Sequence, residues 1–529
     1  MRGLEARAER REERPQSAEL GLDTGDVAAR RRQHVAGGAT TDERAQPRLG
    51  VEPLALEPQR VRVAGGEGPF EGVAAGQGRR RREEGLDLAL ERGQVFGNGH
   101  RARSIIRRTR ARSMGRMTHL RAAHDPRPKL VLALVAACAA AALAAPAPAA
   151  AAERPLAQRL GQALLAPGVS PGRTGALAVD LRTGATIYAR NAELPLVPAS
   201  NQKLAVAYAA LSALGPAYRF HTEVVGRGAL VGDVWTGDLV LKGHGDPTLE
   251  VADLDALARD VVAWGISRVD GAVVADESWF DARRTAPGWR AQFYVNESPP
   301  LSALVVARGW YRGRTSRSPA LAAAALLRER LEAHGVRVAR PSRAGTLGTV
   351  GLPLARDLSV PLARIVRFMG RESDNFTAEM LVKQLGAVAG GSGTTAAGAA
   401  VIRRELAAAQ VPLAGVRLAD GSGLSKLDRL TPSAIVRLLL AGAAADFRDA
   451  FLGSLAVAGV AGTLEDRMRS RPARSQVIAK TGTTRLACAL SGYVRGRYAF
   501  AILHNGSPVA TAAARRSQDR FAAILAAAP

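Results

Sequence analysis

The pattern of hydrophobic and polar positions predicts a mixed α/β protein from about residue 155 onward. Two short apolar segments, 175–181 and 185–189, are separated by the turn Arg182-Thr183-Gly184, which predicts a β-hairpin. An Ala/Leu-rich helix follows over 200–214 and ends at Gly215-Pro216. Helical patterning recurs at 254–264, 319–334, 361–369, 374–388, 394–409 and 431–443.

The end of the chain predicts three strands and a helix, at about 475–482, 486–494, 498–504 and 509–527. We therefore expect an α/β (α+β) fold in which helices pack on an antiparallel sheet. Because 529 residues exceed what one hydrophobic core supports, two or more domains are expected.

The N-terminal third of the chain has a different character. Residues 1–113 are rich in Arg, Glu, Gly and Ala with little apolar periodicity, which indicates either a disordered basic extension or a stretch that is not translated. Residues 114–150 favour the second interpretation, because a basic start, the apolar run 130–144 and an Ala/Pro-rich end are the three parts of a signal peptide. Lipidation at Cys138 is the less favoured alternative. Both predict export to the periplasm or the extracellular cell envelope.

The formal net charge is +25, carried almost entirely by arginine, since the chain has only six lysines. The arginines are scattered, without a basic stripe interleaved with aromatic residues, so we do not expect nucleic acid as a partner. A loose association with anionic envelope polymers or the membrane surface would fit this charge. Of the two cysteines, Cys488 is expected to be a buried, small apolar residue without a disulfide partner.

Three short motifs occur once each and in a fixed order. Only Lys203 among the lysines has a serine three residues before it, only Asn375 among the asparagines has a serine two before it, and only Lys480 is followed by Thr-Gly. The motifs are Ser200-Asn201-Gln202-Lys203, Ser373-Asp374-Asn375 and Lys480-Thr481-Gly482-Thr483. Each is weak alone, but together they form the S-x-x-K, S-D-N, K-T-G set of serine acyl-transfer enzymes.

The first motif predicts a nucleophile and a base. Ser200 lies at the start of a predicted helix, where its N–H is free for an oxyanion. Lys203 is three residues on and faces the same side, so its amine can reach the serine hydroxyl. A neutral lysine can take the serine proton once burial and a second cation, Lys480, lower its pKa.

The other two motifs predict proton relay and substrate binding. Ser373 is expected to pass a proton to the leaving amine, and Asn375 to hold Lys203 and the substrate amide. Lys480 and Thr481 are expected to bind a substrate carboxylate. Gly482 is expected to leave room for an extended peptide, and the N–H of Thr483 to be the second oxyanion donor.

These residues resemble the low-molecular-weight, class C penicillin-binding D-Ala-D-Ala carboxypeptidase/endopeptidase family. Further similar segments extend the resemblance over about 155–527, namely 243–249, 276–280, Gly288-Trp289, 372–380, 420–425 and 461–464. The resemblance implies a serine β-lactamase/penicillin-binding transpeptidase-like domain. It also implies cleavage of peptidoglycan stem peptides through a Ser200 acyl-enzyme, with β-lactam antibiotics as inhibitors.

The spacing of the motifs indicates an inserted domain. From Lys203 to Ser373 is 373 − 203 = 170 residues, more than a compact β-lactamase needs. We divide the mature chain into a transpeptidase-like part 151–220, an inserted α/β domain 221–350 and a second transpeptidase-like part 351–529. The small third domain that the family often nests in the insertion is expected to be missing or trimmed, because 310–317 leads almost directly into the next helix.

Two rival functions remain, a serine β-lactamase and a catalytically silent wall-binding protein. The insertion argues against the first and the intact motifs against the second. No metal and no cofactor are expected to be required, because no clustered His/Cys ligand spacing is present. His244 and Asp246 are interpreted as structural residues of the insertion, whereas Ser422 fits equally a cleft wall and a Gly-rich turn.

Overall fold

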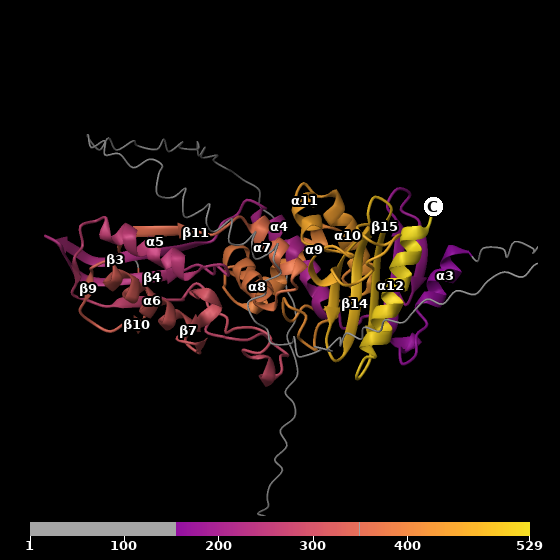
Figure 1. Ribbon diagram of the computed structural model, residues 1–529, viewed down its shortest axis with the longest axis horizontal. Helices are drawn as coiled ribbons and strands as arrows, with labels where there is room; N and C mark the ends of the chain where they lie inside the picture. The colour runs from indigo at the N-terminus through magenta and orange to yellow at the C-terminus, as the bar shows by residue number, and fades with distance from the viewer. Residues whose placement is uncertain (1–154, 349) are drawn as a thin grey trace, which may run out of the picture. The chain divides into compact units, whose positions relative to one another are not determined.

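The computed structural model describes residues 155–348 and 350–529, which form two large sheets with their covering helices and a small two-stranded sheet (Figure 1). The predicted extension 1–113, the signal peptide 114–150 and Cys138 lie outside the described residues. In the described ranges, we find no helix with the length and apolar character needed to cross a membrane.

A six-stranded antiparallel sheet carries the third motif. Its strand order is β12-β13-β14-β15-β1-β2, so the N-terminal hairpin pairs with the C-terminal strands through β1 and β15. The strands are β1 (Thr174–Asp180), β2 (Thr186–Arg190), β12 (Ala456–Val457), β13 (Val477–Thr483), β14 (Ala487–Val494) and β15 (Tyr498–Asn505). The predicted N-terminal hairpin and the three predicted C-terminal strands are therefore confirmed.

Alternating side chains of this sheet enter two cores. On β1, Ala176 and Ala178 pack with Phe521 of α12 and Leu160 of α3, whereas Val179 joins the core beneath α4, α8 and α10. Such alternation with a period of two is what a sheet covered by helices on both faces requires. The helices of this part are α3 (Leu156–Ala163), α4 (Gln202–Leu214), α7 (Leu362–Arg371), α8 (Asn375–Ala389), α9 (Thr395–Ala408), α10 (Pro432–Ala444), α11 (Arg448–Gly453) and α12 (Thr511–Ala527).

The insertion is built on its own seven-stranded mixed sheet. The main path is β10-β6-β4-β3-β11, with β5 beside β4 and β9 beside β5. Helices α5 (Val251–Val262) and α6 (Pro319–Ala333) bury leucines against it in a separate core. The strands are β3 (His221–Val231), β4 (Val234–Gly243), β5 (Arg268–Val269), β6 (Val273–Asp276), β9 (Arg337–Val338), β10 (Arg343–Ala344) and β11 (Leu352–Leu358).

The end of the insertion was placed too early by the sequence. Strand β11 pairs antiparallel with β3, from Leu352 opposite Gly226 to Leu358 opposite His221. Its hydrogen bonds thus join it to the inserted sheet, which extends past the boundary at 350. The segment 310–317, where a third domain was expected to be missing or trimmed, contains a two-stranded hairpin, β7 (Trp310–Tyr311) and β8 (Arg314–Thr315).

Candidate active site

The turn that carries Ser200 is fixed by glycines on both sides. Ser200 lies in the short 3₁₀ turn η2 (Ala199–Asn201) directly before α4. A Cβ at Gly482 of β13 would lie 3.0 Å from the Ser200 nitrogen, and one at Gly423 would lie 1.9 Å from the Ala199 oxygen. Gly423 therefore has to be glycine for the loop to approach the turn, whereas a Cβ at Gly482 would crowd the turn tightly. The sequence explained Gly482 by the room that it leaves for an extended peptide. Its close approach to the Ser200 turn is a second reason for glycine at this position.

Lys203 is placed to act on Ser200. Its Nζ donates to the Ser200 Oγ at 3.1 Å, to the Asn375 Oδ1 at 2.8 Å and to the carbonyl oxygen of Ser422 at 2.7 Å. The side chain is 1% exposed. Burial lowers the pKa of Lys203 to about 8, although carboxylates led by Asp420 and Asp374 act in the opposite direction.

The loop that supplies the Ser422 carbonyl is held by buried carboxyl groups. Glu379 of α8 accepts hydrogen bonds from the N–H groups of Gly421 and Ser422 at 3.0 and 2.7 Å. Asp420 accepts from the Ser422 hydroxyl and from the indole N–H of Trp289. Ser422 therefore serves the site through its backbone and the loop through its hydroxyl, which combines the two interpretations left open by the sequence.

The second motif forms a tight bend between α7 and α8. Ser373 has a φ of 60°, a left-handed conformation, and Asp374 caps α8 by accepting from the N–H of Thr377. Arg308 of the insertion forms a bidentate pair with Asp374, at 2.7 Å for the shorter contact. Although burial works to raise it, the pKa of Asp374 is held below its usual value by Arg308 and the capping bonds.

Asn375 connects Lys203 to the insertion. Its side-chain oxygen accepts from Lys203 at 2.8 Å, and its amide nitrogen donates to the carbonyl oxygen of Glu297 at 3.0 Å. Because both ends of the amide have fixed partners, its orientation is determined by the insertion as well as by α8.

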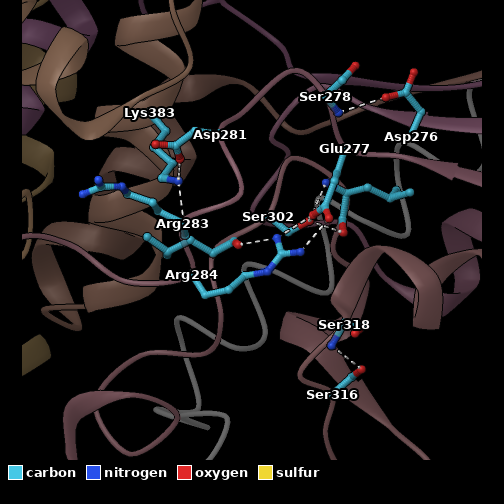
Figure 2. Close-up of polar contacts among 12 residues, drawn as sticks. Asp276, Glu277, Ser278, Asp281, Arg283, Arg284, Ser302, Ser316, Ser318 and Lys383 are labelled. Carbon is cyan, nitrogen blue, oxygen red and sulfur yellow. Dashed lines mark hydrogen bonds and ion pairs between the residues drawn. The ribbon is translucent and has the colours of Figure 1, made fainter. Parts of the chain in front are cut away.

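The segment of the insertion that reaches Asn375 is braced by ion pairs (Figure 2). Arg284 binds both carboxylate oxygens of Glu277 and also the carbonyl oxygen of Leu301. Lys383, a buried residue of α8, donates to Asp281 and to the carbonyl oxygen of Arg283. These contacts hold the insertion's segment 277–302 against the helix that begins at Asn375.

Lys480 reaches the second motif from β13. Its Nζ donates to the Ser373 Oγ at 2.8 Å and to the carbonyl oxygen of Thr481 at 2.9 Å. Burial, and then the neighbouring charge of Lys203, lower the pKa of Lys480 well below its ordinary value. The Thr481 hydroxyl contacts that of Thr463, which extends the polar surface beside the strand.

The structure thus brings all eight candidate residues into contact or onto neighbouring positions of one strand. Ser200, Lys203 and Asn375 form one hydrogen-bonded group, whereas Lys480 and Ser373 form a second, with Thr481 next to Lys480. Gly482 contributes through its lack of a side chain, and Thr483 ends β13 with an exposed side chain.

Sequence reasoning missed the roles of Arg308 and Glu297, and it did not find Glu379 or Trp289 as supports. The similar segments at 288–289, 372–380 and 420–425 pointed to the last two regions, but without roles. No local pattern marks Arg308. Two structural interpretations are confirmed: Asp246 forms a turn by accepting from Thr248, and Cys488 is buried.

This chain is similar to known proteins over most of the described residues. A family model described as the D-Ala-D-Ala carboxypeptidase 3 (S13) family matches residues 156–317 and 310–528. The D-alanyl-D-alanine carboxypeptidase of Actinomadura sp. R39 is 33% identical over 64% of this chain and 79% of its own length. Carboxypeptidase DacB of Mycolicibacterium smegmatis is 30% identical over 70% of this chain and 84% of its own length.

Solved structures support the same fold. Penicillin binding protein 4 (dacB) of Haemophilus influenzae matches with a TM-score of 0.60 at 22% identity, covering 69% of this chain and 97% of that chain. Its complex with a β-lactam matches with a TM-score of 0.57 at 25% identity over the same shares. With the family model matching most of the described residues, the chain belongs to the D-Ala-D-Ala carboxypeptidase 3 (S13) family and is a serine-type DD-peptidase.

Proposed function

We propose that Ser200 is the nucleophile of this DD-peptidase and that Lys203 is its general base. One observation carries the proposal: the Lys203 Nζ is 3.1 Å from the Ser200 Oγ, while Asn375 and the Ser422 carbonyl fix its position. This distance is within reach for proton transfer. A pKa lowered to about 8 leaves part of Lys203 neutral at physiological pH.

The Ser200–Lys203 pair and the Ser373–Lys480 pair are placed for the two proton transfers of acylation. The Ser200 Oγ attacks the carbonyl carbon of the penultimate D-Ala as its proton moves to Lys203. The C–N bond to the terminal D-Ala breaks, and the leaving amine takes a proton through the Ser373 Oγ, which is hydrogen-bonded to Lys480. The N–H groups of Ser200 and Thr483 stabilise the oxyanion, a contribution of about 3 kcal/mol per donor in comparable sites.

The substrate carboxylate decides which lysine is neutral. Two buried amines that repel each other lose their protons one at a time. A carboxylate bound at Lys480 and Thr481 stabilises the charge of Lys480, so Lys203 is the amine left neutral for catalysis. Substrate binding therefore prepares the base.

Water completes the reaction by hydrolysing the Ser200 ester. Peptidoglycan stem peptides are the substrates, and β-lactams acylate the same serine, as expected from the β-lactam complex of the H. influenzae relative. Attack on a D-Ala at the end of a stem gives carboxypeptidase action, and attack on a cross-link gives endopeptidase action. A cell-envelope location follows from this substrate, and residues 114–150 remain the proposed export signal.

Mass spectrometry of the full-length protein after incubation with a penicillin tests the assignment. We expect one adduct, on the peptide containing Ser200, and release of terminal D-Ala or cleaved cross-links from purified cell-wall peptides. Ser200→Ala should lose both the adduct and the cleavage. Labelling that persists in Ser200→Ala would refute the assignment.

The kinetics of penicillin turnover separate the proposed enzyme from a β-lactamase. A DD-peptidase of this kind should recover slowly after stoichiometric acylation, because its acyl-enzyme is long-lived. Rapid hydrolysis of penicillin would instead favour the β-lactamase alternative. No labelling and no peptide cleavage would favour a silent wall-binding protein.

A further inference from the structure

His221, Glu223 and His244 gather on one face of the inserted sheet, apart from the residues of the acyl-transfer site. Each offers a ligand atom, and these atoms all lie within 4.8 Å of one another. His221 and Glu223 are two residues apart on β3, so both side chains leave the same face of the strand. His244 directly follows β4, whose Gly243 is paired with Thr222 of β3, which brings His244 beside His221.

The surroundings indicate that this cluster is not satisfied by protein contacts alone. His244 is 6% exposed, and its Nδ1 is buried without a hydrogen-bond partner among the described residues. Its ring stacks on His221 at 3.8 Å between centroids. A buried polar atom without a partner is unfavourable, so an unfilled coordination position explains it better than packing does.

We propose that His221, Glu223 and His244 form a site for a divalent transition-metal ion, zinc in particular, in the inserted domain. Two imidazoles and one carboxylate are a ligand set that Zn²⁺ accepts, with one position left for water. His221 and Glu223 on β3 and His244 after β4 can therefore approach the metal ion from three directions. Bonds of about 2.0–2.1 Å require ligand atoms about 3.3 Å apart, a distance that side-chain rotation can reach from the present positions.

Neighbouring cations limit the affinity of this site and select its fourth ligand. Lys242 is paired with Glu223 across β3 and β4, and the Arg356 Nε is 3.5 Å from the Glu223 Oε1. Arg356 competes with a metal ion for the carboxylate, and the charge of Lys242 disfavours a cation nearby. Once a metal is bound, the same charges favour an anion over neutral water at the open position.

The metal would strengthen the junction between the insertion and the peptidase part. His244 contacts the edge of Trp279, whose indole N–H donates to Gln384 of α8 at 3.0 Å. Because α8 begins at Asn375, a metal that fixes His244 stabilises this junction without touching the reacting groups. Its measurable effect is therefore binding and stability, and the acylation of Ser200 does not depend on it.

Calorimetric titration of the untagged, full-length protein with ZnCl₂ tests the proposal. We expect a site with 1:1 stoichiometry that is lost in His221→Ala and weakened at least about tenfold in Glu223→Gln, which keeps the shape of the side chain. Lys242→Met should bind zinc more tightly. Zinc should raise the melting temperature of the wild type, whereas Mg²⁺ should leave it unchanged.

His334 provides the matched control. It pairs with Asp255 at 2.9 Å elsewhere in the insertion and has similar exposure, but it belongs to no three-residue cluster among the described residues. His334→Ala should therefore bind zinc like the wild type. Absence of the 1:1 site in the wild type would overturn the proposal. Unchanged binding in both His221→Ala and Glu223→Gln, or a site lost in His334→Ala, would overturn it as well.

Discussion

The peptidase part and the insertion contribute to the same site in different ways. The peptidase part supplies the groups to which the proposed mechanism assigns proton transfer: Ser200, Lys203, Ser373 and Lys480. The insertion supplies a guanidinium and a backbone carbonyl, Arg308 on Asp374 and the Glu297 oxygen on Asn375. One part thus carries the reactive atoms, and the other holds the residues next to them.

The insertion supports the second motif through charge and packing. The bend at Ser373 requires a left-handed φ, and Asp374 at the start of α8 is 13% exposed with a negative charge. Arg308 neutralises that charge, and the small cluster of Phe280, Leu301 and Ala303 packs on Phe376 and Met380 of α8. The position of the second motif is therefore set jointly by its own helix and by the inserted domain.

Removing the base from the peptidase part should have the largest effect. We expect Lys203→Ala to lower the second-order rate constant of acylation by a fluorescent penicillin about 10³- to 10⁴-fold, because Ser200 then lacks a proton acceptor. The unfolding temperature should fall little, since removal of a buried amine also removes its desolvation cost. Stopped-flow fluorescence and thermal unfolding measure the two quantities.

Lys203→Arg provides the control for charge. It keeps a cation at this position but cannot lose its proton, so it should be as inactive as Lys203→Ala. Substantial acylation by either variant would mean that another group takes the serine proton.

Removing the brace supplied by the insertion should have an intermediate effect. Arg308→Ala leaves Asp374, which is 13% exposed, without its charged partner, and the second motif then shifts. We expect the unfolding free energy to fall by about 2 kcal/mol, below the range for fully buried pairs because both side chains are partly exposed, at 18% and 13%. Acylation should slow about 10- to 100-fold from misplacement of Ser373 and Asn375. Denaturant unfolding and labelling kinetics measure both.

Arg312→Ala is the matched control for Arg308→Ala. Arg312 also lies in the insertion and pairs with a carboxylate, Glu329, but its side chain is 74% exposed. It should change neither stability nor acylation measurably. If the two variants behave alike, the pairing of Arg308 with Asp374 does not support the site.

The sequence predicted the motif residues of the peptidase part but not the contacts made by the insertion, for a physical reason. Ser200 and Lys203 are one helical turn apart, and Lys480 to Thr483 share one strand, so local spacing was enough to assign them. The contact of Arg308 with Asp374 spans 66 residues and depends on a left-handed backbone at Arg308. The Glu297 contact uses a backbone oxygen, which no side-chain motif encodes. The predicted end of the insertion at residue 350 was too early for a similar reason. The pairing of β11 with the distant β3 is set by tertiary structure and has no local sequence signal.

The pH dependence of acylation tests whether the insertion also affects the pKa of Lys203 in the peptidase part. Lys203 acts when neutral, and its pKa is lowered to about 8, so the acylation rate should rise about tenfold per pH unit below 8 and level off above it. Nearby carboxylates oppose this shift because they stabilise the protonated amine. Removing one of them should lower the pKa of Lys203 further and move the rising limb to lower pH.

Glu297→Gln removes one of these carboxylates from the insertion, and we expect it to have the smallest effect of the variants. The Glu297 carboxylate acts on the pKa of Lys203 only through its charge, and more weakly than Asp420, Asp374 and Glu379 do. Its backbone oxygen still binds Asn375 in the variant, so the plateau rate should stay the same while the limb moves down by a fraction of a pH unit. Glu332→Gln, which removes an equal charge beside Arg328 on α6, should leave the limb in place. The rising part of the rate profile could instead move to higher pH in Glu297→Gln, or move equally in both variants. Either result would mean that the insertion positions Lys203 without changing its pKa.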